Sequence, residues 1–163
     1  MPRKILDKGI EGIIDEVLTI SKITSETVDL AIKSLKNRDL GLYSAVVKKE
    51  EESDLLNLKI DDDCFRITAL QQPVAKDLRC IATMIKISDN YERICDLSLK
   101  IAEMTLKYEE KPLLKPLIDI PRMGGAIREM IQINDIAIKN WKPMEIKSLQ
   151  EKEDYIDNLY NEI

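Results

Sequence analysis

Acidic residues recur at helical spacing in two stretches of this sequence of 163 residues. Glu50 and Asp54 lie four residues apart in the first stretch, and the second contains Asp89, Glu92 and Asp96. Residues three, four or seven positions apart share one face of a helix, so each set forms a stripe if its stretch is helical. Like charges at this spacing destabilise a helix mildly. The pattern therefore predicts that something positive compensates each stripe.

The two acidic stripes are expected to meet across a helical hairpin. A turn centred near residues 71–72 places Asp54 level with Asp89, and the same turn places Glu50 level with Glu92. Carboxylates gathered at one height repel one another unless protons or cations intervene. An all-oxygen site suits hard cations such as Fe(III), Mn(II), Mg(II) or Ca(II). Ordinary solvated faces paired with nearby Lys and Arg explain the same pattern, and both interpretations stay open at this point.

The composition excludes several other chemistries. The sequence has no histidine, which excludes Ser-His-Asp triads, histidine general bases and imidazole-ligated zinc. A ferritin-like carboxylate metalloenzyme is also disfavoured, because such sites use Glu-x-x-His. The formal net charge is −5 and the sequence has no long basic run, so we expect no nucleic-acid partner.

Cysteine usage and hydropathy indicate the compartment. The three cysteines, Cys64, Cys80 and Cys95, are odd in number and have no CxxC spacing, which is typical of buried apolar thiols in a reducing environment. The longest apolar stretches are far shorter than the roughly 20 residues of a membrane span. We expect a cytoplasmic protein that is peripheral to a membrane only through its partners.

The spacing of apolar residues predicts the elements that would position the acids. Steps of three and four predict helices over residues 11–36 and 40–70. A third helix is predicted to have Pro73 in its first turn and to run to about residue 108. It carries an isoleucine at every seventh position, which predicts a seam against neighbouring helices: Ile87, Ile94 and Ile101.

The second half of the chain predicts two further helices. A proline-containing linker over residues 109–121 precedes a fourth helix at 122–140, and a fifth follows Pro143. The pair Gly124-Gly125 lies in the fourth helix and indicates close helix packing rather than a phosphate loop. Long helices joined by short turns must lie antiparallel, so the predicted fold class is an all-α antiparallel helical bundle.

An internal repeat divides the chain. Residues 29–35 match residues 135–141 at an offset of 106, whereas Glu153 and Asp157 repeat the first acidic pair at an offset of 103. We assign the difference of three residues to an insertion in the connecting loop.

The repeat predicts the domain organisation. Residues 1–108 form one complete three-helix repeat, 109–121 a linker, and 122–163 two helices of a second repeat. The last two helices would lack a third helix to cover their apolar face, and such faces usually mark interfaces. We therefore expect a homodimer, a higher oligomer or a docked partner at this face.

Residues 69–102 resemble the signature of the PhoU family, which regulates phosphate uptake. The family pattern is a QPxAxDLR turn followed by a helix with a LERIGD motif, and this sequence has QQPVAKDLR and then YERICD. Tyr91 stands for the family's leucine and Cys95 for its glycine, while the acids of the motif are kept. The resemblance implies a PhoU-like fold of two tandem three-helix bundles.

The resemblance also implies a metal site. The family's E(D)xxxD motifs bind multinuclear metal clusters, with iron expected first and Zn, Mn, Mg or Ca as alternatives. Transferred by position, the motifs place two pairs in one site and a third pair in half of a second site: Glu50 with Asp54, Glu92 with Asp96, and Glu153 with Asp157. Asp89 is added to the first site by the hairpin geometry alone.

The function implied by the resemblance is regulatory rather than enzymatic. The protein would contact a phosphate-transport ATPase and a membrane sensor kinase, and would damp uptake and phosphate-starvation signalling. Two other functions remain possible on the residues alone: a carboxylate-rich module for metal binding or storage, and a regulatory helical domain of another ion transporter.

Overall fold

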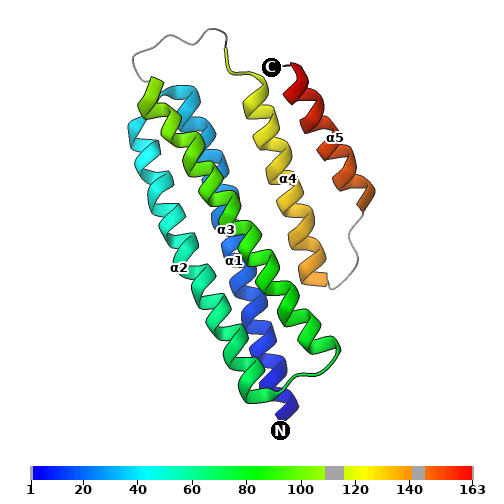
Figure 1. Cartoon of the computed structure of the whole chain (residues 1–163). Helices are drawn as coiled ribbons and strands as arrows, with labels where there is room; N and C mark the ends of the chain where they lie inside the picture. The colour runs from blue at the N-terminus through cyan, green and yellow to red at the C-terminus, as the bar shows by residue number, and fades with distance from the viewer. Residues whose placement is uncertain (1, 109–115, 141–145, 163) are drawn as a thin grey trace.

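The computed structural model describes residues 2–108, 116–140 and 146–162, and the regular structure within these ranges is helical. The helices are α1 (Pro2–Asn37), α2 (Leu40–Gln71), α3 (Lys76–Tyr108), α4 (Asp119–Asn140) and α5 (Ile146–Glu162). Figure 1 shows α1, α2 and α3 as long neighbouring rods, with α4 and α5 side by side along one flank. The predicted all-α antiparallel bundle is confirmed.

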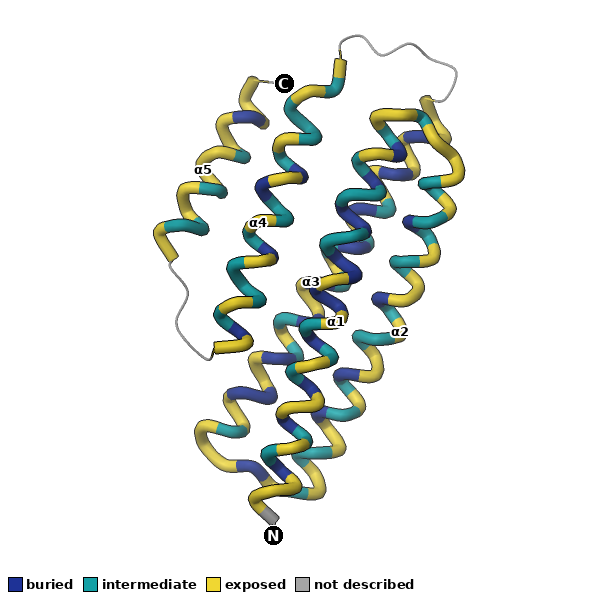
Figure 2. The backbone as a smooth tube through the Cα atoms, turned by 180° about the vertical axis from the view of Figure 1, so that it is seen from behind, coloured by how far each residue is buried: buried dark blue, intermediate teal, exposed yellow. Residues whose placement is uncertain are grey.

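α1 is the central helix of the molecule. It contacts α2, α3 and α4, whereas α5 contacts only α4 within the described ranges. Buried side chains follow one another closely along α1: Ile13, Val17, Ile20, Thr24, Thr27 and Ala31. Ser21, Ile23 and Val28 are buried beside this stripe, so the buried face of α1 is wide enough to contact more than one neighbour. Figure 2 shows the contrast, because buried positions run the length of α1 whereas α5 is largely exposed.

The face of α3 that packs into the bundle is lined by small residues. Its buried positions include Ser88, Cys95 and Ala102, which repeat every seven residues. The predicted isoleucine seam lies one position before each of them: Ile87, Ile94 and Ile101. Ile87 and Ile94 are only partly buried, and Ile101 is 38% exposed. The predicted seam is therefore confirmed in part: Ile87 and Ile94 pack against the core cluster, whereas Ile101 is exposed, and the fully buried row one position later consists of small residues.

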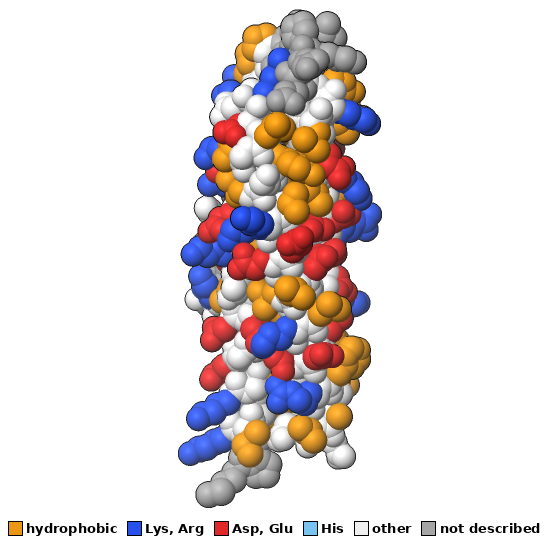
Figure 3. Space-filling view, turned by 90° about the vertical axis from the view of Figure 1, so that its left-hand side faces the viewer, with side chains coloured by type: hydrophobic (Ala, Val, Ile, Leu, Met, Phe, Trp, Pro, Cys, Tyr) orange, Lys and Arg blue, Asp and Glu red, His pale blue; other side chains and the backbone are white. Residues whose placement is uncertain are grey.

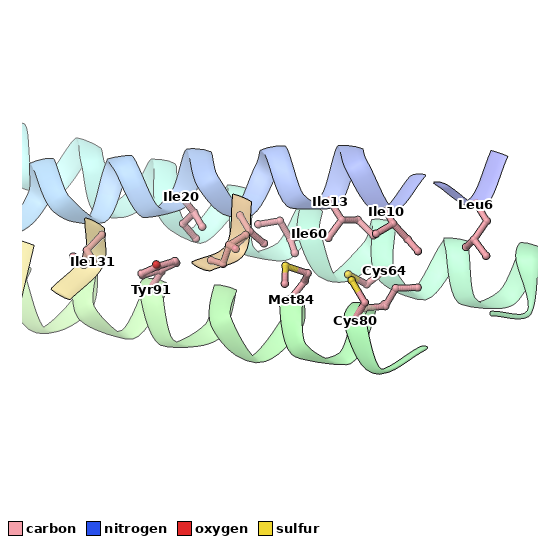
Figure 4. Packing of buried hydrophobic residues seen from close by; sticks show 13 residues of the cluster. Leu6, Ile10, Ile13, Ile20, Ile60, Cys64, Cys80, Met84, Tyr91 and Ile131 are labelled. Carbon is pink, nitrogen blue, oxygen red and sulfur yellow. The ribbon is translucent and has the colours of Figure 1, made fainter. Parts of the chain in front are cut away.

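A cluster of apolar side chains fills the interior, and Figure 4 shows Cys64, Cys80 and Met84 together within it. All three cysteines are free and buried, as predicted. Burial raises the pKa of Cys64 to about 12 and that of Cys80 to about 11. These thiols therefore stay protonated at neutral pH and act as small apolar side chains.

The turn between α2 and α3 differs from the prediction. α3 begins at Lys76, so Pro73 lies before the helix rather than in its first turn. α2 ends with Gln72 in the left-handed conformation (φ 47°), where its backbone N–H donates to the carbonyl of Thr68. Proline commonly follows a cap of this kind because it cannot continue the helix.

Two other helices begin earlier than predicted. α1 starts at Pro2 rather than at residue 11, because Leu6 and Ile10 extend its buried stripe. α4 starts at Asp119, so the predicted linker is shorter and Pro121 lies inside the first turn. Proline is tolerated there because the N–H groups of a first turn have no helical partner. Residues 109–115 lie outside the described residues.

Three contacts hold α4 against α1. The Ser21 hydroxyl donates to Asp135 at 2.6 Å, and the Arg128 guanidinium donates to Asp29 at 2.9 Å. A Cβ on Gly124 would lie 1.9 Å from Cδ1 of Ile32, whereas one on Gly125 would meet nothing within 4 Å. The predicted close packing is therefore confirmed for Gly124 and wrong for Gly125.

The two repeats correspond at a single offset of 103 residues. Glu50 and Asp54 of α2 correspond to Glu153 and Asp157 of α5, which lie 103 residues later. The same offset relates two ion pairs that join the helices of each hairpin: Glu26 with Lys49, and Glu129 with Lys152. The predicted three-residue insertion is therefore wrong, because the likeness between residues 29–35 and 135–141 is displaced by about one helical turn from the structural equivalence.

The α4–α5 hairpin carries exposed apolar side chains, which agrees with the predicted uncovered face, but it is not the only such region among the described residues. Ile136, Ile146 and Tyr160 are exposed there, but α2 and α3 carry longer exposed stripes. None of the helices within the described ranges is long and apolar enough to cross a membrane.

Candidate metal centre between α2 and α3

Four carboxylates lie where α2 and α3 face each other, two from each helix, and we call this set the acidic groove: Glu50, Asp54, Glu92 and Asp96. All four side chains are partly buried. Glu50 and Glu92 each lie close enough to Asp54 and Asp96 for their charges to interact, and the charge of Glu92 also acts on Glu50. Figure 3 looks onto the side of the molecule that carries α2, where acidic side chains gather midway along the face with apolar patches above and below. The predicted convergence of the two acidic stripes is confirmed for these four residues.

The acids of α2 and α3 that lie opposite each other differ from the predicted partners by about one helical turn. The helix ends Gln71 and Lys76 put the centre of the turn between residues 73 and 74 rather than at 71–72. Glu92 therefore faces Asp54 rather than Glu50. The shift arises because the turn includes Pro73 and two following residues that the prediction placed in α3.

Asp89 lies one turn away from the centre of the groove. Its carboxylate accepts a hydrogen bond from the Asn57 amide at 3.3 Å, and it is exposed. Its charge acts on Asp61 of α2 as well as on Glu92. The geometric argument that added Asp89 to the site depended on the wrong turn centre, so its place is at the edge of the acidic groove.

Burial and mutual repulsion set the electrostatics of the acidic groove. Partial burial, followed by the charges of Asp54 and Asp96, raises the pKa of Glu50. The same causes in the same order raise the pKa of Glu92, and a hydrogen bond with Asp54 adds to the shift. Carboxylates in this condition favour binding a proton or a cation. The groove is therefore a place where positive charge is stabilised.

Few basic groups compensate this charge. Lys100 donates to Asp96 at 2.7 Å along α3. The buried Oδ1 of Asp54 has no hydrogen-bond partner among the described residues. A buried carboxylate oxygen without a donor is costly and is a feature that a bound cation would relieve.

The donor set fits a hard metal ion, but its side chains are not yet in ligating positions. No three acidic or thiol side chains in the described part of the chain are arranged to hold one ion. The oxygen-only donors, the orphaned oxygen of Asp54 and the raised pKa values of Glu50 and Glu92 match the chemistry of such a site. Binding would require these side chains to rotate toward one another.

Sequence reasoning missed a second layer below the groove. Asp61 continues the α2 stripe seven residues after Asp54, and burial together with Asp89 raises its pKa. Asn57 of α2 donates a hydrogen bond to Asp89 and accepts one from the Ser88 hydroxyl, so it links α2 to α3 beside Asp61. The seven-residue spacing was the available signal, but Asp61 lies in a run of three aspartates that resembles an ordinary solvated surface.

The third acidic pair lies in different surroundings. Glu153 and Asp157 are exposed on α5, away from the acidic groove. No helix in the described ranges faces them with a second pair of acids, because α5 contacts only α4. Half of a second metal site at this pair stays a prediction.

A separate pocket of about 480 Å³ lies between α4 and α5. Glu129 and Lys152 form an ion pair at its wall, and Tyr155 lines it from α5. It shares no residue with the acidic groove, so this pocket and the carboxylate cluster are different features of the molecule.

Comparison with known proteins identifies the fold family. The PhoU domain matches residues 17–105, a span that contains the whole acidic groove. A phosphate-specific transport system accessory protein PhoU homolog from Aquifex aeolicus is 33% identical over 158 residues, which cover 97% of this chain and 72% of that protein.

Two further relatives carry the same description. The homolog from Deinococcus radiodurans is 26% identical over 161 residues, covering 99% of this chain and 76% of its own. The homolog from Clostridium acetobutylicum is 26% identical over 164 residues, covering 100% of this chain and 75% of its own. The similarity therefore extends over both repeats.

Proposed function

The chain belongs to the PhoU family, and from this premise we propose that it is an accessory regulator of phosphate uptake. Its relatives are described as accessory proteins of phosphate-specific transport systems. We propose that it acts in the cytoplasm through protein contacts rather than by catalysis. A phosphate-transport ATPase and a membrane sensor kinase are the partners that this role requires.

The acidic groove is the proposed regulatory site. The observation that supports it is the joint rise in the pKa of Glu50 and Glu92, which burial and neighbouring carboxylates cause. Glu50 and Asp54 from α2, with Glu92 and Asp96 from α3, would hold one or more cations. Iron is proposed first, and Mn, Mg, Ca or Zn are alternatives. A bound metal would supply positive charge and open coordination positions for phosphate oxygens.

The chain's own contribution is to hold this charge between two helices. Asp54 and Glu92 come from different helices, so neutralising them together would draw α2 and α3 closer along the groove. Asp96 already forms an ion pair with Lys100. The other three acids would therefore gain most from the positive charge of a bound cation. Metal occupancy would in this way alter the packing of the surface that partners contact.

The proposal is tested by measuring phosphate uptake in cells that lack the protein. The cells are complemented with the wild type, with Asp54→Asn/Glu92→Gln, or with the matched control Glu153→Gln/Asp157→Asn. Under abundant phosphate we expect the wild type and the control to lower uptake and the groove variant to fail. Unchanged uptake with the wild type would overturn the regulatory role, whereas a fully active groove variant would overturn only the role of the acids.

A further inference from the structure

A polar cluster is buried where α1, α3 and α4 meet. The Ser21 hydroxyl of α1 is fully buried, and it donates to the Asp135 carboxylate of α4 at 2.6 Å. Tyr91 of α3 is 3% exposed, and its hydroxyl lies beside the same two side chains. Figure 4 shows the Tyr91 ring within the apolar cluster, pointing from α3 toward α1. We call these three residues the junction cluster.

The equivalent place at the other end of the α1–α4 contact is apolar. The repeat offset of 103 residues relates Ser21 to Gly124 and Ile32 to Asp135. The pair Ser21–Asp135 is therefore the counterpart of the pair Gly124–Ile32, in which an isoleucine side chain packs against a glycine. An apolar contact is sufficient to dock α4 on α1 at this position. The carboxylate is an addition that costs desolvation energy, which indicates a role besides docking.

The Asp135 carboxylate has two donors beside it and bonds to one of them. Burial raises the pKa of Asp135, although Ser21, Lys139 and Tyr91 act to lower it. Burial also raises the pKa of Tyr91 to about 12, so its phenol keeps its proton at neutral pH and stays a donor. The Tyr91 hydroxyl has no hydrogen-bond partner of ordinary geometry among the described residues. A small movement of α3 or α4 is therefore enough to complete this contact or to break it.

Tyr91 connects α3 to α4 through the length of its side chain. The backbones of the two helices do not approach each other closely within the described ranges, because α4 packs against α1 instead. The next residue of α3, Glu92, interacts with Asp54 of α2 across the acidic groove. Consecutive residues of a helix point about 100° apart. Tyr91 and Glu92 therefore join one turn of α3 to two different neighbours.

A movement of α3 changes these two contacts in opposite senses. Figure 1 shows α3 between α2 and α4, which share no contact among the described residues. Repulsion among the carboxylates of the acidic groove pushes α3 away from α2, which is toward α4. Removing a charge from the groove lets α3 settle toward α2 and draws Tyr91 away from Asp135.

We propose that the junction cluster couples the charge of the acidic groove to the docking of α4. A fully charged groove holds Tyr91 beside Asp135, and neutralising the groove withdraws Tyr91 and loosens α4 from the first repeat. The coupling gives the second repeat a response to the state of a site that it does not touch. This inference goes beyond the proposed function. It rests on repulsion within the groove and requires neither a bound metal nor a role in phosphate uptake.

Hydrogen–deuterium exchange of the α4 amides at neutral pH tests the coupling, with a chelator present to remove any metal. The proteins compared are the wild type, Tyr91→Phe, Glu92→Gln and the double variant. We expect each single variant to speed exchange in α4 about threefold or more, the scale of one weak hydrogen bond. The double variant should exchange no faster than Tyr91→Phe, because the contact through which the groove acts is already lost.

Two matched controls separate the coupling from the mere loss of a hydroxyl or of a charge. Tyr43→Phe alters a partly buried tyrosine of α2 in a different cluster, and Glu153→Gln alters an exposed acid of α5. Neither should change the exchange of α4.

Three outcomes would overturn the proposal. The first is Glu92→Gln or Tyr91→Phe with α4 exchange as slow as in the wild type. The second is a double variant in which the two effects multiply, since independent effects exclude coupling. The third is faster exchange throughout the chain, which is a general loss of stability rather than release of α4. Circular dichroism melting of each variant checks that it is folded.

Discussion

The same acidic motif occurs in α2 and in α5, 103 residues apart, and the structure gives it two different surroundings. In α2, Glu50 and Asp54 are partly buried and face the acids of α3. In α5, Glu153 and Asp157 are exposed and face no third helix within the described residues. The motif spacing is identical, so spacing alone does not make a site. A third helix that encloses the motif and adds its own acids makes the difference.

The comparison extends to the two hairpins that carry the motif. α1 and α2 are enclosed by α3, whereas α5 is covered on one side by α4 alone among the described helices. The Glu–Lys pair that joins the helices is retained in both, as Glu26 with Lys49 and Glu129 with Lys152. The ion pair that joins the two helices is therefore present in both hairpins. Among the described residues, the repulsion that raises the pKa of the motif's glutamate is found in α2, where α3 adds two further acids.

The largest expected effect comes from equivalent core positions in the two repeats. Ile20 of α1 is fully buried, and the equivalent Met123 of α4 is partly exposed. We expect Ile20→Ala to lower the free energy of unfolding by about 2–5 kcal/mol and Met123→Ala by about 1 kcal/mol, because the first leaves a larger cavity. Urea denaturation measures both. Equal losses would contradict the view that the first repeat is the better-packed unit.

The next effect tests the junction between the repeats. Gly124→Leu would drive a side chain into Ile32, and we expect it to lower the free energy of unfolding by about 1–3 kcal/mol. Gly125→Leu is the matched control, since a Cβ there meets nothing. The control should raise stability by up to about 1 kcal/mol, because glycine is a poor helix former. Thermal melting of the two variants checks the prediction, and a control as unstable as Gly124→Leu would refute the role of close packing.

Periodicity predicted the helices and the acidic groove well, because both depend on the local spacing of side chains. The turn was the source of the errors in register. Gln72 and Ala75 adopt positive φ values of 47° and 43° without being glycine. Such conformations are uncommon for these residue types and have no sequence signal. A turn two residues longer than expected was enough to exchange the partners of Asp54 and Glu50.

The alignment of the two repeats shows a second limit of prediction from sequence. The likeness between residues 29–35 and 135–141 is genuine, but it is one turn out of register with the structural equivalence. Helical sequences tolerate such an error because a shift of three or four residues keeps apolar positions on nearly the same face. The offset of the acidic pair was the better guide, because charged positions are not interchangeable in this way.

The smallest effect concerns pH. Glu92 has a raised pKa in the folded protein, so the folded state binds more protons than the unfolded state between the two pKa values. The contribution of protonated Glu92 to the free energy of unfolding is complete below the pKa that Glu92 has in the unfolded chain. It is lost as the pH rises through the higher pKa of the folded protein.

In metal-free protein at pH 7, Glu92→Gln should therefore raise the free energy of unfolding by about 0.5 kcal/mol. At pH 4 it should give no gain. Glu153→Gln is the matched control and should change little at either pH. Urea denaturation in the presence of a chelator measures all three proteins, and a Glu92→Gln variant that is less stable than the wild type at pH 7 would contradict the repulsion.

The most direct test of the account compares metal binding at the two acidic pairs. Thermal melting is measured for the wild type, Asp54→Asn/Glu92→Gln and Glu153→Gln/Asp157→Asn, each without metal and with Mn(II). The account predicts that Mn(II) at 100 times its dissociation constant stabilises the wild type and the α5 variant by about 2.7 kcal/mol, a shift of several degrees. The groove variant should show no shift. A wild type that does not respond, or a groove variant that responds as fully as the wild type, would contradict the claim that enclosure by α3 turns the acidic motif into a cation site.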